Sequence, residues 1–185
     1  MSKTCYAYQS IARATHEHGV DTMFGLMGDA NLFMVDSFVR DCGGRFVGAA
    51  HEASSVLMAL AYSYVSGKVG VATVTHGPAL TNCTTALTEA ARGNVPMVVL
   101  AGDTPVSNPR HVQGIDQREV VKVTGAGFEQ LRSPETIGAD VARVFYRAQI
   151  EQRPIVLNMP ADFMWQEVTH SAHVLNVYNA PTGVA

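Results

Sequence analysis

Apolar residues recur with a helical period in some stretches of the chain and form short continuous runs in others. Leu32, Val35, Phe38 and Val39 stand one to three positions apart on one helical stripe, which predicts a helix over residues 31–42. The run at residues 69–74 is largely apolar without a helical period, and its length is typical of a buried strand. Further helices are predicted at residues 5–18, 53–66, 80–92 and 133–152, and further strands at residues 20–26, 45–49, 96–101 and 154–159.

Helical and strand-like segments alternate along this pattern. Such alternation is typical of a parallel sheet that carries helices on both faces. We therefore predict the α/β class, as a three-layer sandwich with a mostly parallel central sheet. One domain is predicted at residues 1–165, and the polar, irregular residues 166–185 are predicted to be a linker or tail.

The composition is that of a soluble globular domain, with 47% hydrophobic and 16% charged residues in a chain of 185. The formal net charge of −3 gives no electrostatic reason to expect nucleic acid or an anionic membrane as a partner. No apolar run approaches the roughly 20 residues that a membrane-spanning helix needs. Cys5, Cys42 and Cys83 lack a CxxC spacing, and we expect reduced thiols in a cytoplasmic protein.

Candidate chemistry is concentrated where two strand-like runs give way to helix-like runs. The first stretch, residues 50–53, contains Glu52, and the second is residues 75–82. Parallel sheets bind ligands at the carboxyl ends of their strands, so we expect the two stretches to meet at one edge. Taken alone, Glu52 could simply stabilise a helix N-terminus, and the second stretch could be a plain turn capped by Thr81 or Asn82.

Several ordered motifs accompany Glu52. They are Val-Asp-Thr-Met-Phe-Gly at residues 20–25, Ala-Tyr at 61–62, Gly-Lys-Val-Gly-Val at 67–71, Thr-His-Gly-Pro-Ala-Leu-Thr-Asn at 75–82, Asn-Val-Pro-Met-Val-Val-Leu-Ala-Gly at 94–102 and Arg-Pro-Ile-Val-Leu-Asn-Met-Pro at 153–160. Together they resemble the N-terminal pyrimidine-binding domain of thiamine diphosphate enzymes, most closely the acetolactate synthase-like branch. The resemblance implies a part of a transferase or lyase that decarboxylates or ligates 2-oxo acids.

The resemblance makes Glu52 the catalytic candidate. In the family, a glutamate at this position bonds the aminopyrimidine ring nitrogen of the cofactor and favours the imino tautomer, which then removes the thiazolium proton. A carboxyl group suits this task because it can share or donate a proton over a short, charge-assisted bond. The adjacent His51 is interpreted as a structural or interface histidine rather than a proton-transfer group.

The turn at residues 24–28 is a first candidate for further cofactor contacts. By itself, its Gly-x-x-Gly pattern is neither a dinucleotide fingerprint nor a Walker A loop. It resembles the Phe-Gly-x-Pro-Gly turn that lines the cofactor cleft in the family, with Met27 in place of the proline. The resemblance therefore implies that Met27 and Gly28 are cofactor-binding candidates.

The turn at residues 75–82 resembles the Gly-Pro-Gly-x-Thr-Asn turn of the family, whose residues contact the pyrimidine end of the cofactor. Two departures, Ala79 for the second glycine and His76 where serine is common, bear on substrate class more than on cofactor binding. The cofactor-binding candidates in this turn are Thr75, Gly77, Pro78 and Asn82, in addition to Glu52 itself.

One loop glutamine is a candidate for the substrate side. Residues 111–117 overlap the Phe-Gln-Glu region of the family, whose glutamine faces the reaction centre. Gln113 is the better match and Gln117 the rival, while a solvated loop glutamine is equally compatible with the pattern. Asp103 lacks the Gly-Asp-Gly context of the family's metal motif, so we predict no metal site in this chain.

The resemblance implies parts that 185 residues do not contain. In the family, the diphosphate and its Mg²⁺ are held by a second domain, usually separated by a middle domain. We therefore expect either an excised N-terminal domain, completed in cis, or the small subunit of a two-gene decarboxylase, completed by a partner subunit in trans. We also expect a homodimer or higher homo-oligomer. The remaining alternative is a non-catalytic interaction module with the same fold.

Overall fold

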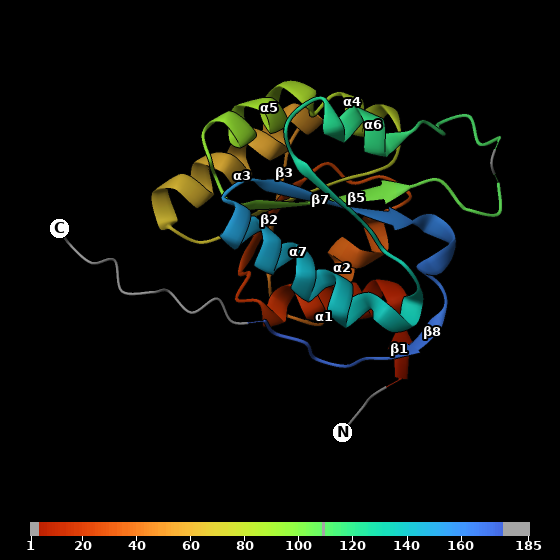
Figure 1. The fold of residues 1–185 in the computed structure, drawn as a ribbon. Helices are drawn as coiled ribbons and strands as arrows, with labels where there is room; N and C mark the ends of the chain where they lie inside the picture. Colours follow the sequence, from red (N-terminus) through yellow and green to blue (C-terminus); the bar gives the residue numbers. More distant parts are fainter. Residues whose placement is uncertain (1–3, 109, 176–185) are drawn as a thin grey trace.

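The computed structural model describes residues 4–108 and 110–175, which form a six-stranded parallel sheet between two layers of helices (Figure 1). The strand order is β3-β2-β4-β5-β7-β6, and every pairing within this sheet is parallel. The strands of the sheet are β2 (Thr22–Gly25), β3 (Arg45–Gly48), β4 (Gly70–Val74), β5 (Met97–Asp103), β6 (Gly127–Gln130) and β7 (Pro154–Pro160).

Helices cover both faces of the sheet. In Figure 1, α1, α2 and α7 lie on one face, and α3, α4, α5 and α6 lie on the other. This confirms the predicted three-layer α/β fold. The helices are α1 (Ala7–Glu17), α2 (Leu32–Arg40), α3 (Glu52–Ser66), α4 (Pro78–Thr81), α5 (Thr84–Arg92), α6 (Gln117–Lys122) and α7 (Ile137–Glu151), with the 3-10 turns η1 (Pro134–Thr136) and η2 (Ala161–Phe163).

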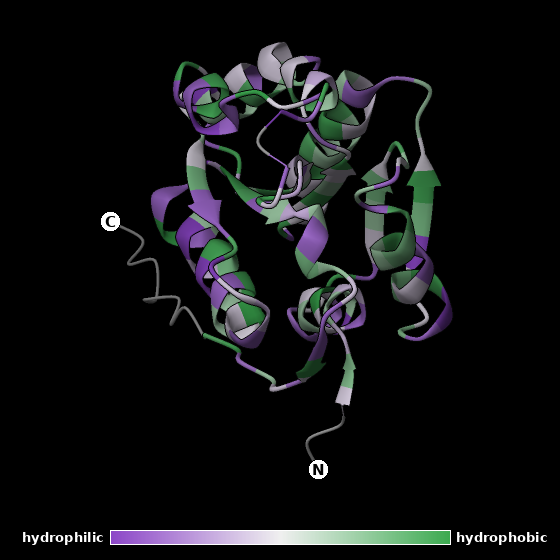
Figure 2. Ribbon diagram, turned by 90° about the vertical axis from the view of Figure 1, so that its right-hand side faces the viewer, coloured by the Kyte–Doolittle hydropathy of each residue, from purple (hydrophilic) through white to green (hydrophobic). Residues whose placement is uncertain are grey.

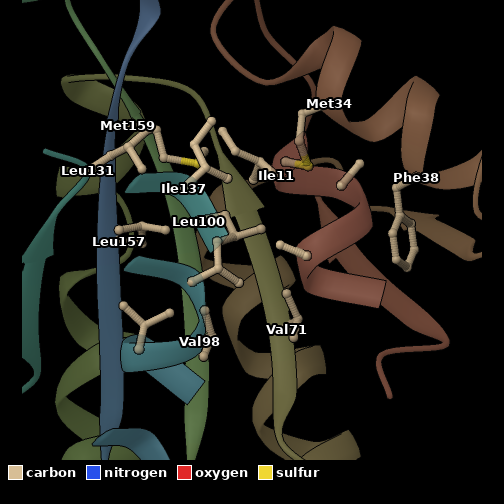
Figure 3. Close-up of a cluster of buried hydrophobic side chains, with 14 of the residues drawn as sticks. Ile11, Met34, Phe38, Val71, Val98, Leu100, Leu131, Ile137, Leu157 and Met159 are labelled. Atoms are coloured by element: carbon tan, nitrogen blue, oxygen red, sulfur yellow. The ribbon is translucent and has the colours of Figure 1, made fainter. Parts of the chain in front are cut away.

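The central strands are apolar on both sides because both sides are covered. In β5, Val98 and Leu100 join the cluster under α1, α2 and α7, whereas Met97 and Val99 join the cluster under α3 and α5. Figure 3 shows the first cluster, in which Ile11, Met34, Phe38, Val71, Val98, Leu100, Leu131, Ile137, Leu157 and Met159 are labelled. In Figure 2, hydrophobic residues lie mostly along the strands and hydrophilic residues along the outer faces of the helices.

Several elements differ from the sequence-based prediction. β6 was not predicted, and the helix predicted at residues 80–92 is divided into α4 and α5. α6 begins at Gln117, the last of residues 111–117, which were predicted to form a loop. Within residues 166–185, predicted as a linker or tail, β8 (Glu167–Thr169) pairs antiparallel with β1 (Thr4–Tyr6), and residues 176–185 lie outside the described part of the chain. These two strands have only three residues each, with a single buried side chain apiece, so they show little of the apolar pattern that marks a strand.

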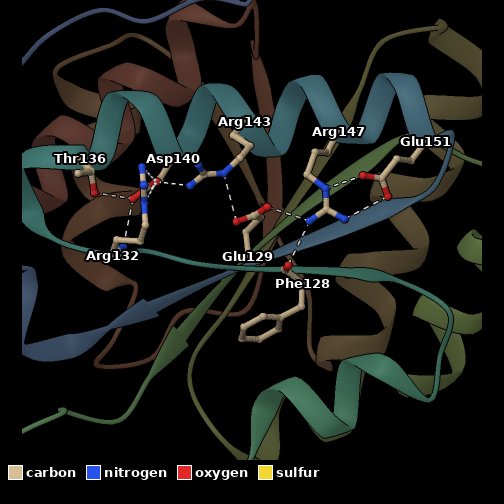
Figure 4. Close-up of polar contacts among 8 residues, drawn as sticks. All are labelled: Phe128, Glu129, Arg132, Thr136, Asp140, Arg143, Arg147 and Glu151. Carbon is tan, nitrogen blue, oxygen red and sulfur yellow. Dashed lines mark hydrogen bonds and ion pairs between the residues drawn. The ribbon is translucent and has the colours of Figure 1, made fainter.

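A row of charged side chains joins α7 to β6 and the chain that follows it (Figure 4). Asp140, fully buried, accepts hydrogen bonds from Arg132 Nε at 2.8 Å and Thr136 Oγ1 at 2.6 Å, and it is also paired with Arg143. Further along, Arg147 Nη1 lies 2.9 Å from Glu129 Oε1 and its Nη2 donates to Glu151 Oε2 at 3.1 Å. We call Glu129, Arg132, Asp140, Arg143, Arg147 and Glu151 the charged ladder.

None of the helices in the described part of the chain is long and apolar enough to cross a membrane.

Candidate functional site

The carboxyl ends of the parallel strands bring Glu52 and the turn at residues 75–82 to the same edge of the sheet. Asn82, at the end of α4, donates a hydrogen bond from Nδ2 to Glu52 Oε2 at 2.9 Å, although the two residues are 30 positions apart. Glu52 is the first residue of α3, directly after the connection that leaves β3. The expected meeting of the two stretches is therefore found in the structure.

The second carboxylate oxygen of Glu52 has no hydrogen-bond partner among the described residues. The side chain is half-buried at the N-terminus of α3, where the helix dipole favours negative charge. Its neighbour His51 is the N-cap, and its Nδ1 accepts a hydrogen bond from the backbone N–H of Ala53 at 3.2 Å. His51 thus has a structural contact, as interpreted from the sequence, while Glu52 keeps one oxygen available for a ligand.

A buried thiol lies behind this carboxylate. Burial and, to a smaller extent, the negative charge of Glu52 together raise the pKa of the Cys83 thiol to about 12. Cys83 donates to the backbone carbonyl of Ala79 at 3.3 Å. Cys83 is therefore a protonated packing residue, not a nucleophile for this edge.

Gly77 gives the second stretch a backbone shape that requires glycine. Its φ of 61° and ψ of −114° are accessible to glycine and costly for other residues. A Cβ at this position would lie 2.0 Å from the backbone oxygen of Gln113. Pro78 follows as the first residue of α4, where its fixed φ suits a helix start. The Gly-Pro pair therefore turns the chain sharply at the edge of the sheet.

Gly28 packs against the same edge. A Cβ on Gly28 would come within 2.7 Å of Thr75 Cβ, so the turn after β2 and the end of β4 fit closely. Thr75 Oγ1 donates to Asp29 Oδ1 at 3.0 Å, which fastens the two segments together. Met27 is about half exposed, at 49%. The structure thus brings the candidates Met27, Gly28 and Thr75 together.

Asn31 organises this turn and was not predicted from the sequence. It is 1% exposed; its Oδ1 accepts from the backbone N–H of Gly28 at 2.7 Å, and its Nδ2 donates to Leu26 O at 3.2 Å and Thr73 Oγ1 at 3.1 Å. Its asparagine side chain was the only local signal, since that residue type commonly bonds nearby backbone in turns.

His76, the residue that departs from the family pattern, is buried at 1% exposure. Its Nε2 lies 3.3 Å from Asp29 Oδ1, and its ring centroid lies 5.1 Å from that of His111 in an edge-on arrangement. The imidazole of His76 is therefore packed near Asp29 and His111 and is shielded from solvent.

The two rival glutamines occupy different environments. The side-chain amide of Gln113 makes no hydrogen bond with any described residue, and the side chain is half-buried. Gln117 is 3% exposed, and its amide is bonded to the backbone of Gly77 and Gly102. Of the two, Gln113 is the one whose amide is not already engaged by the protein.

No group of three potential metal-ligating His, Cys, Asp or Glu side chains occurs within residues 4–108 and 110–175. Asp103 is occupied by structural contacts: its Oδ1 accepts from the backbone N–H of Thr104 at 2.7 Å and its Oδ2 from Asn158 Nδ2 at 2.5 Å.

Comparison with known proteins identifies the family. Residues 6–122 match the family model described as thiamine pyrophosphate enzyme, N-terminal TPP binding domain. Because this match covers more than half of the chain, the protein belongs to that family, and the predicted resemblance is confirmed.

Among similar proteins is the sulfoacetaldehyde acetyltransferase of Rhodobacter capsulatus, 31% identical over 83% of this chain and 26% of that protein. A probable 2-ketoarginine decarboxylase of Pseudomonas aeruginosa is 32% identical over 91% of this chain and 31% of that protein. The acetolactate synthase large subunit of Parasynechococcus marenigrum is 32% identical over 80% of this chain and 25% of that protein. The chain thus spans about a quarter to a third of the length of these relatives.

The residues at the edge fit the pyrimidine end of thiamine diphosphate. Glu52 offers a carboxylate oxygen without a protein partner, next to the exposed Asn82. Gly77 turns the chain at the same edge, where the backbone oxygen of Gln113 occupies the place that a Cβ would take. A carboxylate suits an aminopyrimidine ring because it can share a proton with a ring nitrogen.

Proposed function

We propose that this chain supplies the pyrimidine-binding half of a thiamine diphosphate-dependent enzyme that decarboxylates or ligates 2-oxo acids. The observation that carries the proposal is the Glu52 carboxylate, with one oxygen fixed by Asn82 and the other without a described partner. The names of the relatives support the substrate class, since they include an acetolactate synthase and a probable 2-ketoarginine decarboxylase.

When bound, thiamine diphosphate would supply a carbon nucleophile for chemistry at the carbonyl carbon of a 2-oxo acid. Glu52 acts at the other ring of the cofactor, where its Oε1 holds a proton that it shares with a pyrimidine ring nitrogen. Asn82 keeps Oε2 engaged, so that proton sharing is confined to Oε1. General acid–base contacts of this kind contribute roughly 10²–10⁴ in rate.

The remaining candidates surround this carboxylate in the proposal. Met27, Gly28, Thr75, Gly77 and Pro78 contact the pyrimidine end, because they come from the two turns that meet at the edge. Gln113 faces the substrate side, which its unpaired amide supports. Mg²⁺ and the diphosphate are held by a domain outside this chain.

The proposal includes self-association through α3 and α5. Three large apolar residues on α3 are exposed, at 46% for Leu57, 81% for Tyr64 and 85% for Val65. Such a surface favours a contact with another chain. Light scattering of the full-length protein tests this point: we expect a dimer or larger assembly, and a strict monomer at high micromolar concentration would contradict it.

The experiment that tests the function uses the full-length protein that contains this segment. Calorimetric titration with thiamine diphosphate, with and without Mg²⁺, is combined with carbon dioxide release from pyruvate and 2-ketoarginine. We expect Mg²⁺-dependent binding by wild type and by Glu52→Gln, with turnover lost only in Glu52→Gln. The control is Glu135→Gln, an exposed carboxylate on η1. Full turnover by Glu52→Gln would contradict the proposal.

A second titration tests whether the diphosphate and its Mg²⁺ are bound outside residues 1–185. Residues 1–185 alone are expected to bind thiamine diphosphate weakly, because the doubly charged diphosphate and its Mg²⁺ should carry much of the affinity. Tight, Mg²⁺-dependent binding by this segment alone would overturn the assignment of the metal to another domain.

A further inference from the structure

Two amide side chains lie buried beneath the candidate site. Gln117 and Asn158 are 3% and 2% exposed, on α6 and β7 respectively. Gln117 Oε1 accepts from the backbone N–H of Gly77 at 2.9 Å, and its Nε2 donates to Gly102 O at 3.0 Å and to Asn158 Oδ1. We call Gln117 and Asn158 the amide clamp.

The clamp ties together the carboxyl ends of four neighbouring strands. Gly77 follows β4, Gly102 and Asp103 belong to β5, and Asn158 belongs to β7. Asn158 Nδ2 completes the set by donating to Asp103 Oδ2 at 2.5 Å and to Gln130 Oε1, on β6, at 2.9 Å. A single layer of side chains thus fixes the relative positions of the loops that leave these strands.

The Gln117 amide makes three hydrogen bonds in the interior. Its Oε1 accepts one bond and its Nε2 donates two, which offsets most of the cost of burying this polar group. The specific consequence is for Gly77, because the backbone N–H at this turn has no other described acceptor.

Gly77 is held from two sides by one segment of the chain. The backbone oxygen of Gln113 approaches its Cα so closely that a Cβ would be 2.0 Å away, while the side chain of Gln117 receives its N–H. The unusual φ and ψ of Gly77 persist only if the surroundings determine them. Gln117 contributes to this restraint through its hydrogen bond with the Gly77 N–H, and the Gln113 backbone contributes through close packing.

The restraint extends to the catalytic candidate through one turn of helix. Leu80 N donates to Gly77 O at 2.9 Å, and Asn82 N donates to Pro78 O at 3.1 Å. The position of the Asn82 side chain is therefore set by the Gly77 turn, and Asn82 contacts Glu52. α4 has only four residues, too few to be stable without such support.

We propose that Gln117 is a positioning residue: it holds the Gly77 turn so that Asn82 presents its amide to Glu52. The effect of Gln117 on catalysis rests on the proposed function. The effect of Gln117 on the Gly77 turn does not rest on it, so the two effects can be tested separately.

The test compares two substitutions in the full-length protein. Gln117→Met keeps the side-chain length but removes the acceptor, whereas Gln117→Glu keeps an acceptor for the Gly77 N–H. The control is Gln130→Leu, which removes one partner of Asn158 and leaves Gly77 untouched. Hydrogen–deuterium exchange of a peptide that spans residues 75–82 reports on the turn, and cofactor proton–deuterium exchange at the thiazolium carbon reports on function.

We expect exchange at Gly77 to rise by roughly 2- to 10-fold in Gln117→Met, the range for one lost hydrogen bond, and to stay near wild type in Gln130→Leu. The rise should be smaller in Gln117→Glu, which keeps the acceptor for the Gly77 N–H but loses the two donors to Gly102 and Asn158. Cofactor exchange should slow in Gln117→Met by a similar factor. A rise in all three variants in proportion to their loss of stability would mean a merely structural role, and would overturn the inference. An unchanged Gly77 signal in Gln117→Met would overturn it directly.

The companion variant Glu52→Gln separates this inference from the proposed function. In one outcome, Glu52→Gln slows cofactor exchange, whereas Gln117→Met increases hydrogen exchange at Gly77 without slowing cofactor exchange. The positioning role of Gln117 is then wrong, and the proposed function stands. If neither variant slows it, the proposed function fails, and the link from Gln117 to catalysis fails with it.

Discussion

The charged ladder and the candidate site are both rich in polar side chains, but they differ in how completely those groups are paired. In the ladder, Asp140 is fully buried and surrounded by donors, and Arg147 is shared between Glu129 and Glu151 (Figure 4). At the site, Glu52 keeps one oxygen without a described partner. Buried polar groups in native proteins are normally satisfied. The dense pairing in the ladder indicates stability, although Arg143 Nε has an ion pair with Glu129 and no described hydrogen bond, and the carboxylate oxygen without a described partner at the strand ends indicates a place for a ligand.

The largest expected effect is a loss of unfolding free energy when the charged ladder, rather than the candidate site, is changed. Asp140→Ala removes the fully buried acceptor of several partly exposed donors, and losing hydrogen bonds to a charged group of this kind costs about 1.5–3 kcal/mol. Denaturant unfolding measures this loss. The matched control is Asp36→Ala, whose pair with Arg40 is exposed and should contribute less than about 0.5 kcal/mol. Equal losses of unfolding free energy in both variants would contradict the claim that the charged ladder stabilises the fold more than an exposed ion pair does.

Gly77→Ala should disturb the site more than its backbone strain alone predicts. A left-handed φ costs a non-glycine residue about 1–2 kcal/mol, and the added Cβ also collides with Gln113 O. We expect the turn to shift and cofactor affinity to fall at least about tenfold, or ~1.4 kcal/mol. Gly67→Ala is the control, since Gly67 has a φ of 71° but nothing within 4 Å of a Cβ. Equal cofactor affinity in the two variants would argue against the Gly77 turn as a binding element.

These regions also show what could be read from the sequence. The alternation of elements was predictable because covered strands such as β5 are continuous apolar runs. β6 was missed because it is an edge strand of four residues, with Glu129 and Gln130 among them. Nothing local marks such a segment as the partner of β7.

At the site, the meeting of Glu52 with Asn82 followed from the rule that parallel strands end at one edge. The roles of Asn31 and Gln117 did not follow. Their partners Thr73 and Gly77 are 42 and 40 positions away, and a polar residue at a predicted helix start or in a predicted loop gives no sign that it will be buried. Buried amides become visible only once the strands that they connect have been placed.

Asn82→Ala should have a smaller effect, and it should act on the candidate site without destabilising the fold. It removes the donor to Glu52 Oε2 at an exposed position, which should cost about 0.5–1.5 kcal/mol, or roughly 2- to 10-fold in cofactor-dependent turnover. Stability should be nearly unchanged. Asn82→Asp should be more harmful because it places a second carboxylate beside Glu52. A turnover loss matched by a loss of stability would indicate a structural contact instead.

The smallest effect is a pH dependence of the ladder. Hydrogen bonds from Arg147 hold the pKa of Glu151 below its ordinary value, with burial opposing. Because the folded pKa is lower than the unfolded value near 4.5, the contribution is complete above that pH and is lost as the pH falls through the folded pKa. For this partly exposed pair we expect no more than about 1 kcal/mol.

Unfolding of wild type and Glu151→Gln from about pH 6 to about pH 3 measures this dependence. The difference in unfolding free energy between the two proteins should shrink as the pH falls. A difference that stays constant over this range would show that the Glu151 charge does not contribute.

The central claim is that Glu52 activates the cofactor, and proton–deuterium exchange at the thiazolium carbon of bound thiamine diphosphate tests it most directly. In the full-length protein, Glu52→Gln keeps the side-chain volume but cannot share a proton. We predict exchange slowed by roughly 10²–10⁴, with an unchanged melting temperature and with Glu135→Gln behaving as wild type. Unchanged exchange in Glu52→Gln, with stability lowered by about 0.3–1 kcal/mol, would show that Glu52 only stabilises the start of α3.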